Sequence, residues 1–187
     1  MNQAIKIKLP ADAATLKSLK TGDMVLICGT VYVARDSAHR RILEALEQGK
    51  LLPFSLRGQS IYYMGPAPAK PGQIIGSAGP TTSGRMDVYT PALLAEGLKI
   101  MIGKGERSTE VKKAIKKYRA VYLGATGGAG ALIAKSVKNC KIVAYPDLGT
   151  EAVLRLEIED FPAVVVNDVY GGDLYEEGKA KYKRAVP

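Results

Sequence analysis

Apolar residues along the chain follow two alternating patterns: short runs rich in β-branched residues, and longer stretches with apolar positions three or four apart. The run 24–33, MVLICGTVYV, is apolar throughout and predicts a strand buried on both faces. Its central Gly29 predicts a close backbone approach or a bulge. The stretch that starts at Asp36 or Ser37 repeats apolar residues at helical spacing up to Gly49, and therefore predicts a helix.

Similar patterns divide the rest of the chain into elements. An extended opening and a helix over 11–20 precede the first apolar run, and from residue 98 strands and helices alternate, which is typical of βαβ units around a parallel sheet. The expected strands there are 98–102, 120–124 and 142–145, and the expected helices are 108–118 and 128–137. Two more strand-like runs, 152–158 and 163–169, are split by residues 159–162, and a charged, frayed tail is expected after residue 172.

The region between the helix that ends near Gly49 and the strand that begins at residue 98 has a different pattern. Short extended pieces at 60–64 and 73–77 flank a stretch rich in Pro and Gly, which predicts a β-rich subregion with a surface loop. The polar, turn-rich segment 79–87 then leads into an expected helix over 88–96. Residues 1–187 contain no internal repeat, and we predict a single α/β domain.

Composition narrows the class of protein. Among 187 residues, 47% are hydrophobic and 24% are charged, which excludes a disordered chain, and the net charge is +9. No export signal or membrane span is predicted, so we expect a cytoplasmic protein. Iron–sulfur and zinc sites generally need three or four Cys or His ligands, whereas this chain offers only Cys28, Cys140 and His39, far apart in sequence. We therefore expect no metal to be bound by this chain alone.

Cationic and hydroxyl side chains gather at the ends of three predicted elements. Arg35 lies at a strand-to-helix junction, Lys104 lies between two glycines, and residues 81–85 read TTSGR just before a predicted helix. Free N–H groups at a helix start and an Arg fork both suit a carboxylate or phosphate. A capped turn with a solvated Arg is the plainer interpretation of TTSGR, and an exposed surface position is the plainer one for His39.

A glycine-rich segment, residues 124–130, lies between a predicted strand and a predicted helix. A dinucleotide fingerprint, G-x-G-x-x-G, would need a glycine at position 133, which is Ile133, and no P-loop follows. Tight turning or close packing is therefore favoured over nucleotide binding, although the helix start could still bind an anion such as a substrate carboxylate.

Five motifs in this order resemble the β subunit of class I fumarate hydratases and the related L-tartrate dehydratases. They are ARDSAH at 34–39, GPTTSGRMD at 79–87, IGKG at 102–105, GATGGA at 124–129 and EIEDFPA at 157–163. The resemblance implies a swivelling β/β/α domain with a mixed sheet. It also implies a partner α subunit that binds a [4Fe–4S] cluster through three cysteines, in a heterodimer or an α2β2 assembly.

The resemblance also implies roles for particular residues in the reversible hydration of fumarate to S-malate. Arg35, Arg85 and Lys104 would bind the carboxylates of the dicarboxylate substrate, and Thr81 would act as the general base. The sequence does not separate Thr81 from its neighbour Thr82 in that role. Further residues with expected supporting roles are Asp87, which would orient Arg85, together with Gly127 and Gly128.

Several alternatives stay open at this point. The β-subunit motifs are shared by enzymes that act on fumarate and on L-tartrate, so either dicarboxylate is compatible with the sequence. The basic charge would attract a dianionic substrate or a less basic partner subunit. A non-catalytic scaffold or a nucleic-acid-binding domain is the alternative of a different class; we expect no nucleic acid partner, because aromatic residues make up only 6% of the chain and no nucleic-acid-binding motif occurs. The isolated chain could also pair with itself.

Overall fold

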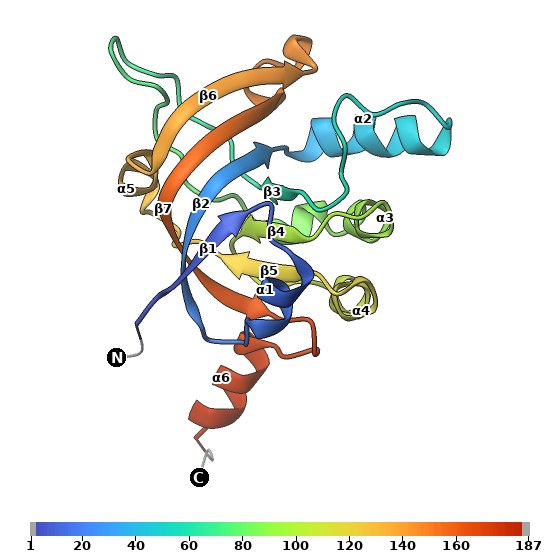
Figure 1. The fold of residues 1–187 in the computed structure, drawn as a ribbon, viewed down its shortest axis with the longest axis vertical. Coiled ribbons are helices and arrows are strands. Elements are labelled where there is room, and N and C mark those ends of the chain that lie inside the picture. Colours follow the sequence, from blue (N-terminus) through green and yellow to red (C-terminus); the bar gives the residue numbers. More distant parts are fainter. Residues whose placement is uncertain (1–2, 185–187) are drawn as a thin grey trace.

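The computed structural model describes residues 3–184, which form one seven-stranded sheet with helices packed on it (Figure 1). The strands are β1 (Ile5–Leu9), β2 (Met24–Val33), β3 (Ser60–Tyr62), β4 (Ile100–Gly103), β5 (Val121–Gly124), β6 (Val137–Ala144) and β7 (Val153–Asn167). The α-helices are α1 (Ala13–Ser18), α2 (Asp36–Glu47), α3 (Thr90–Ala95), α4 (Thr109–Tyr118), α5 (Gly130–Ala134) and α6 (Leu174–Tyr182). Short 3₁₀ helices span Ser83–Met86 and Pro146–Glu151. None of the helices in the described residues is long and apolar enough to cross a membrane.

The sheet is mixed and closes partly into a barrel. Strands β1 to β5 are parallel in the order β1-β2-β3-β4-β5, while β7 runs antiparallel to both β5 and β6. Strand β7 also pairs antiparallel with β2, so that β2, β3, β4, β5 and β7 form a closed ring. The mixed α/β fold implied by the resemblance is confirmed. The alternating pattern after residue 98 correctly predicts that β4 and β5 are parallel. The third strand expected there, 142–145, belongs instead to β6, which pairs antiparallel with β7.

Alternate residues of the central strands supply two separate apolar cores. On β4, Ile100 and Ile102 lie in the core inside the barrel, whereas Met101 lies in the core between the sheet and the helices. Figure 1 shows α2, α3 and α4 side by side along the outer face of these strands, where Ile42 and Ile115 are fully buried. Both faces of the parallel strands are therefore covered, which explains their continuous apolar runs.

Gly29 provides both of the features expected from its position in β2. Its φ of +110° lies in a region that L side chains rarely adopt, and the pairing of β2 with β7 shifts register between Ile27 and Gly29. A side-chain carbon at Gly29 would lie 2.5 Å from the carbonyl oxygen of Leu9 on the neighbouring β1. The bulge and the close approach of β1 are thus confirmed together.

Several of the predicted elements differ from the structure. Residues 73–77 form no strand, because this segment folds back on residues 66–68, and the Ala67 N–H donates to Ser77 O at 3.0 Å. The expected helix 128–137 ends at Ala134, and β6 begins at Val137 instead of residue 142. The expected break at 159–162 does not occur: β7 continues through these residues with a kink at Asp160 (φ +49°), and its pairing with β2 and β6 holds it together. Helix α6 replaces the frayed tail, because the Asp173 side chain caps its first N–H groups.

Candidate active site

The candidate residues lie at the edge of the sheet where the parallel strands end. Arg35 follows the end of β2 by two residues, Lys104 directly follows β4, and Gly127 follows the end of β5 by three. Because β2, β4 and β5 run in the same direction, their carboxyl ends meet at one edge of the sheet. The structure thus brings together three segments that are separated by some 90 residues in the chain.

The segment with the two threonines is held against the same edge by backbone hydrogen bonds. The Thr81 N–H donates to Tyr63 O at 2.8 Å, and the Lys104 N–H donates to Thr81 O at 3.2 Å. The Ser83 N–H donates in turn to Lys104 O at 2.9 Å, so that Thr82 and Lys104 lie side by side as a short parallel bridge. Thr81 is half-buried and Thr82 is exposed.

The two arginines are linked through one carboxylate. Arg85 Nε lies 2.9 Å from Asp36 Oδ1, and Arg35 Nε lies 3.8 Å from the other oxygen of Asp36. Arg35 also packs on the backbone of Gly65. A side-chain carbon added at residue 65 would lie 2.0 Å from Arg35 Nη1. Gly65 directly follows Met64, which pairs with Pro80. Arg35 therefore lies close to the loop that carries the threonines.

A second carboxylate, Glu151, completes this cluster. Its Oε1 lies 3.3 Å from Arg35 Nη2, and its other oxygen accepts a hydrogen bond from the Ser37 N–H at 2.8 Å. Hydrogen bonding from Ser37, together with the charges of Arg35 and Arg85, lowers the pKa of Glu151. Asp36 and Glu151 were not predicted as partners of the arginines, since Asp36 was considered only as a possible helix start and Glu151 lies on a distant segment.

Asp87 has a different role from the one predicted. Its Oδ1 accepts from Arg107 Nε at 2.7 Å, and its Oδ2 accepts from the Ser108 N–H at 2.6 Å. Arg85 pairs with Asp36 instead, so the expectation that Asp87 orients Arg85 is wrong. Arg107, whose side chain is fully buried, had no distinguishing signal in the sequence.

His39 is buried rather than exposed, contrary to the sequence-based interpretation. Its Nδ1–H donates to Arg35 O at 2.8 Å, its ring packs edge-on against Tyr63, and its Nε2 has no hydrogen-bond partner among residues 3–184. The helix turns inward here because residues 38, 39 and 42 share the face of α2 that packs on the sheet. Burial lowers the pKa of His39 to about 4, so the ring is neutral at pH 7.

This burial predicts a pH-dependent stability. The pKa of His39 is near 6.5 when the chain is unfolded and about 4 when it is folded, so the unfolded chain binds the proton more tightly. The contribution of the neutral, buried His39 ring to the free energy of unfolding is complete above pH 6.5. It decreases by about 3 kcal/mol in all as the pH falls toward 4. Urea unfolding of wild type and His39→Asn across pH 4–7.5 measures it. The prediction would be contradicted if the free energy of unfolding of the wild type fell with decreasing pH no more steeply than that of the variant.

The glycine-rich segment packs closely against the threonine loop. Gly127 lies beside the Lys104 side chain and, with Thr126, lines a cavity of about 340 Å³ that also reaches Lys104. Gly128 has a φ of +80°, which suits a tight turn. The start of α5 touches the loop directly, since the Ala78 N–H donates to Gly130 O at 3.0 Å. Close packing and tight turning are therefore confirmed for this segment.

Gly130→Ala is expected to displace the loop that carries Thr81. A side-chain carbon at Gly130 would lie 2.3 Å from Ser77 Oγ and 2.8 Å from the backbone nitrogen of Gly79, so the backbone itself must move. We expect a lower melting temperature, by several degrees, measured by circular dichroism. Gly84→Ala is the matched control, because its added carbon meets only Glu106 O, at 3.9 Å. Equal melting temperatures for the two variants would contradict this packing.

Comparisons with known proteins decide the family. The family model described as "Fumarase C-terminus" matches residues 1–178. This chain belongs to the fumarase C-terminal family. A protein of Methanocaldococcus jannaschii named "Putative L(+)-tartrate dehydratase subunit beta" is 41% identical over 172 residues, covering 89% of this chain and 88% of that protein. The family predicted from the five motifs is thus confirmed.

Longer proteins of the same family match as well. "Fumarate hydratase 2" of Leishmania major is 42% identical over 92% of this chain, and "Fumarate hydratase class I, aerobic" of Escherichia coli K12 is 42% identical over 88% of it. The matched parts are 31% and 30% of those two proteins. The fumarase C-terminal chain therefore spans about a third of the length of the fumarate hydratases it matches.

Proposed function

We propose that this chain is the β subunit of a two-subunit hydro-lyase that interconverts fumarate and S-malate. The observation that carries the proposal is the gathering of two arginines, a lysine and a half-buried threonine at one edge of the sheet in a member of the fumarase C-terminal family. We propose that the enzyme acts in the cytoplasm, where the free thiols Cys28 and Cys140 are stable.

In the proposal, the three cations bind and orient the dicarboxylate. Arg35 and Arg85 each offer a planar fork that matches a carboxylate, and Lys104 offers a point charge on an exposed side chain. Asp36 and Glu151 hold the two guanidinium groups in place before the substrate arrives. A substrate carboxylate then accepts hydrogen bonds from those N–H groups that the two protein carboxylates leave free.

Thr81 is the proposed base. In the dehydration direction it takes the proton from the carbon next to one carboxylate, and in the hydration direction it returns that proton. A threonine alkoxide is strongly disfavoured in water, so the proton transfer depends on nearby positive charge and on exclusion of water. The half-buried position of Thr81 supports this assignment over the exposed Thr82.

The side chains of this site do not fit an iron–sulfur cluster. Hydroxyl, ammonium and guanidinium groups are not cluster ligands, and no group of three His, Cys, Asp or Glu residues that could hold a metal ion occurs among residues 3–184. The steps above therefore involve only this chain's own groups. We propose that a partner α subunit binds the [4Fe–4S] cluster at an interface with the carboxyl edge of the sheet.

Dehydration of L-tartrate is the second candidate reaction. It is favoured by the M. jannaschii relative, whose full length resembles that of this chain and whose name gives tartrate as the substrate. Fumarate and L-tartrate share the two carboxylates that Arg35, Arg85 and Lys104 would bind. The proposed roles of these residues are the same for both substrates.

The experiment is an anaerobic assembly of the chain with its α subunit, followed by separate assays with fumarate and with L-tartrate. We expect turnover of fumarate, and an increase in KM of about tenfold or more in Lys104→Gln. The control is Lys141→Gln, an exposed lysine on β6, which is expected to leave KM unchanged. Turnover of L-tartrate but not of fumarate would show that L-tartrate is the substrate. If an assembled, cluster-loaded complex turned over neither compound, the proposal would be overturned in favour of a scaffold or binding role.

A further inference from the structure

A basic cavity lies at the opposite edge of the sheet from the candidate active site. It has a volume of about 500 Å³, and three of its lining residues stand just before parallel strands: Gly58 before β3, Lys99 before β4 and Arg119 before β5. The amino ends of parallel strands meet at the edge opposite their carboxyl ends. The cavity is therefore separated from Lys104 by the length of β4.

All charged side chains that line the cavity are cations. They are Lys17, Arg57, Lys99, Lys117 and Arg119. None of the five forms an ion pair with a carboxylate of the described residues, whereas Arg35, Arg85 and Arg107 each do. Two carboxylates adjoin lining residues in the sequence. Asp12 accepts from the Thr15 N–H at 2.7 Å as the N-cap of α1, and Asp168 accepts from the backbone N–H groups of Thr21, Tyr170 and Gly172. The folded chain thus leaves a concentration of uncompensated positive charge here.

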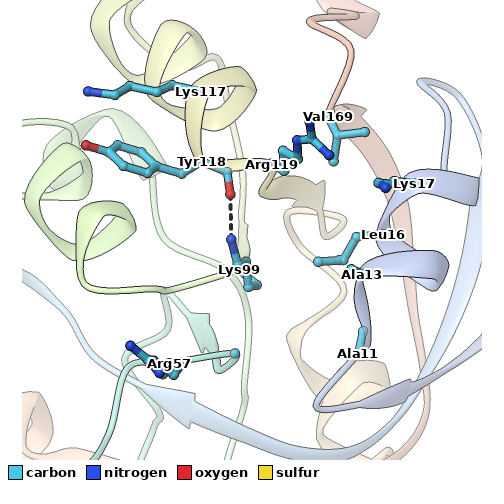
Figure 2. A pocket seen from close by; sticks show the side chains of 11 residues that line it. Ala11, Ala13, Leu16, Lys17, Arg57, Lys99, Lys117, Tyr118, Arg119 and Val169 are labelled. Atoms are coloured by element: carbon cyan, nitrogen blue, oxygen red, sulfur yellow. Dashed lines mark hydrogen bonds between the residues drawn. The ribbon is translucent and has the colours of Figure 1, made fainter.

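The cations come from separate elements. Figure 2 shows Lys99 in the middle of the cavity, with Arg57 on one side and Lys17 and Arg119 on the other. Lys99 Nζ donates one hydrogen bond to Tyr118 O at 2.5 Å, which fixes the ammonium group and leaves its other two N–H bonds for a ligand. In the same view Lys117 points away from this group.

One wall of the cavity is apolar. Leu16, which is buried, and Val169 face it together with Ala11 and Ala13 (Figure 2). Cavities of this volume hold small organic molecules rather than a single ion. The combination of clustered cations with an apolar wall suits a ligand that has one strongly charged end and one organic part.

We propose that this cavity binds a small organic phosphate. The phosphate group lies between Lys17, Lys99 and Arg119, where its charge relieves the repulsion among the cations, and the organic part packs on Leu16 and Val169. A phosphate carries up to two charges on a compact group and so suits several cations lining one cavity better than a single carboxylate does. This inference does not depend on the proposed reaction.

Titration calorimetry on the full chain with ATP, inorganic pyrophosphate and adenosine tests the proposal at 0.15 M salt. We expect one ATP per chain, weaker binding of pyrophosphate and no binding of adenosine. Lys17→Gln/Arg119→Gln is expected to raise the Kd for ATP by about tenfold or more. It leaves the bond between Lys99 and Tyr118 intact, and an unchanged far-ultraviolet circular dichroism spectrum shows that the variant folds.

Two controls separate this cavity from other sources of affinity. Arg40→Gln/Lys50→Gln removes the same charge from exposed positions on and after α2, and is expected to leave the Kd within about twofold. Arg35→Gln, in the candidate active site, is expected to leave it unchanged. The proposal would be overturned if ATP showed no saturable binding. It would also be overturned if the charge control Arg40→Gln/Lys50→Gln lost as much affinity for ATP as Lys17→Gln/Arg119→Gln, or if Arg35→Gln abolished ATP binding. Pyrophosphate binding as tightly as ATP would overturn the role of the apolar wall.

Discussion

Thr81→Ala is expected to lower the kcat of the assembled enzyme by about 10²–10⁴-fold while leaving assembly with the partner intact. The variant removes the hydroxyl that would take and return the proton, but it keeps the backbone bonds from Thr81 to Tyr63 and Lys104. Under the proposed function, Arg35, Arg85 and Lys104 bind the substrate, so KM should change little. Steady-state kinetics with fumarate, and size-exclusion chromatography of the complex, measure the two quantities.

Thr82→Ala is the matched control for this prediction. The two threonines are adjacent, and Thr82 is exposed whereas Thr81 is half-buried. We expect Thr82→Ala to retain most of the wild-type kcat. The reverse order of effects would move the base to Thr82, and near wild-type kcat in both variants would show that neither threonine is the base.

Asp87→Ala is expected to lower the free energy of unfolding by about 3–5 kcal/mol. Arg107, whose side chain is fully buried, donates from Nε to Asp87 at 2.7 Å and from Nη2 to Thr90 Oγ1 at 2.8 Å. Removing the carboxylate leaves a buried guanidinium without its counter-charge. The guanidinium stays buried against the rings of Tyr63 and Tyr122. Urea unfolding at pH 7 measures the change.

A second Asp–Arg pair on the surface supplies the control. Asp147 pairs with Arg41, and the Asp147 side chain is 59% exposed, so Asp147→Ala is expected to cost less than about 1 kcal/mol. Replacing both buried partners, in Arg107→Met/Asp87→Leu, is expected to recover part of the loss. An Asp87→Ala variant no less stable than Asp147→Ala would contradict the account of the buried pair.

The buried pair connects to the candidate active site through Tyr122. The Tyr122 hydroxyl, beneath the Arg107 guanidinium, donates to Gly105 O at 2.9 Å and accepts from Ser83 Oγ at 2.8 Å. Ser83 follows the two threonines, and Gly105 follows Lys104. Arg107 thus packs on the ring whose hydroxyl links Ser83 to Gly105, the residues that follow Thr82 and Lys104.

The fold was predictable from sequence wherever a pattern was local. The apolar run of β2, the alternation of strands and helices after residue 98 and the need for glycine at position 29 all follow from neighbouring residues. The continuity of β7 was not predictable in the same way. Asp160 and Pro162 are typical of a break, and only the pairing of β7 with β2 and β6, both distant in sequence, carries the strand through them.

In the candidate site, too, only features that depend on neighbouring residues could be predicted. Residues 35, 81, 85 and 104 could be singled out because cations and hydroxyls follow predicted elements, and the family motifs gave them roles. Their partners could not be found that way, since Glu151 is more than 100 residues from Arg35. His39 was misjudged because its arginine neighbours suggested an exposed helix face, whereas the packing of α2 turns the ring inward.

Under the proposed function, this chain supplies part of an active site that is complete only with a partner subunit. The most direct measurement is fumarate hydration under anaerobic conditions by this chain alone, by the cluster-loaded α subunit alone, and by mixtures of the two in increasing ratio. We expect no activity from either protein alone, and activity that rises with added chain to a plateau at one chain per α subunit. Fumarate hydration at the full rate by either protein alone would contradict it.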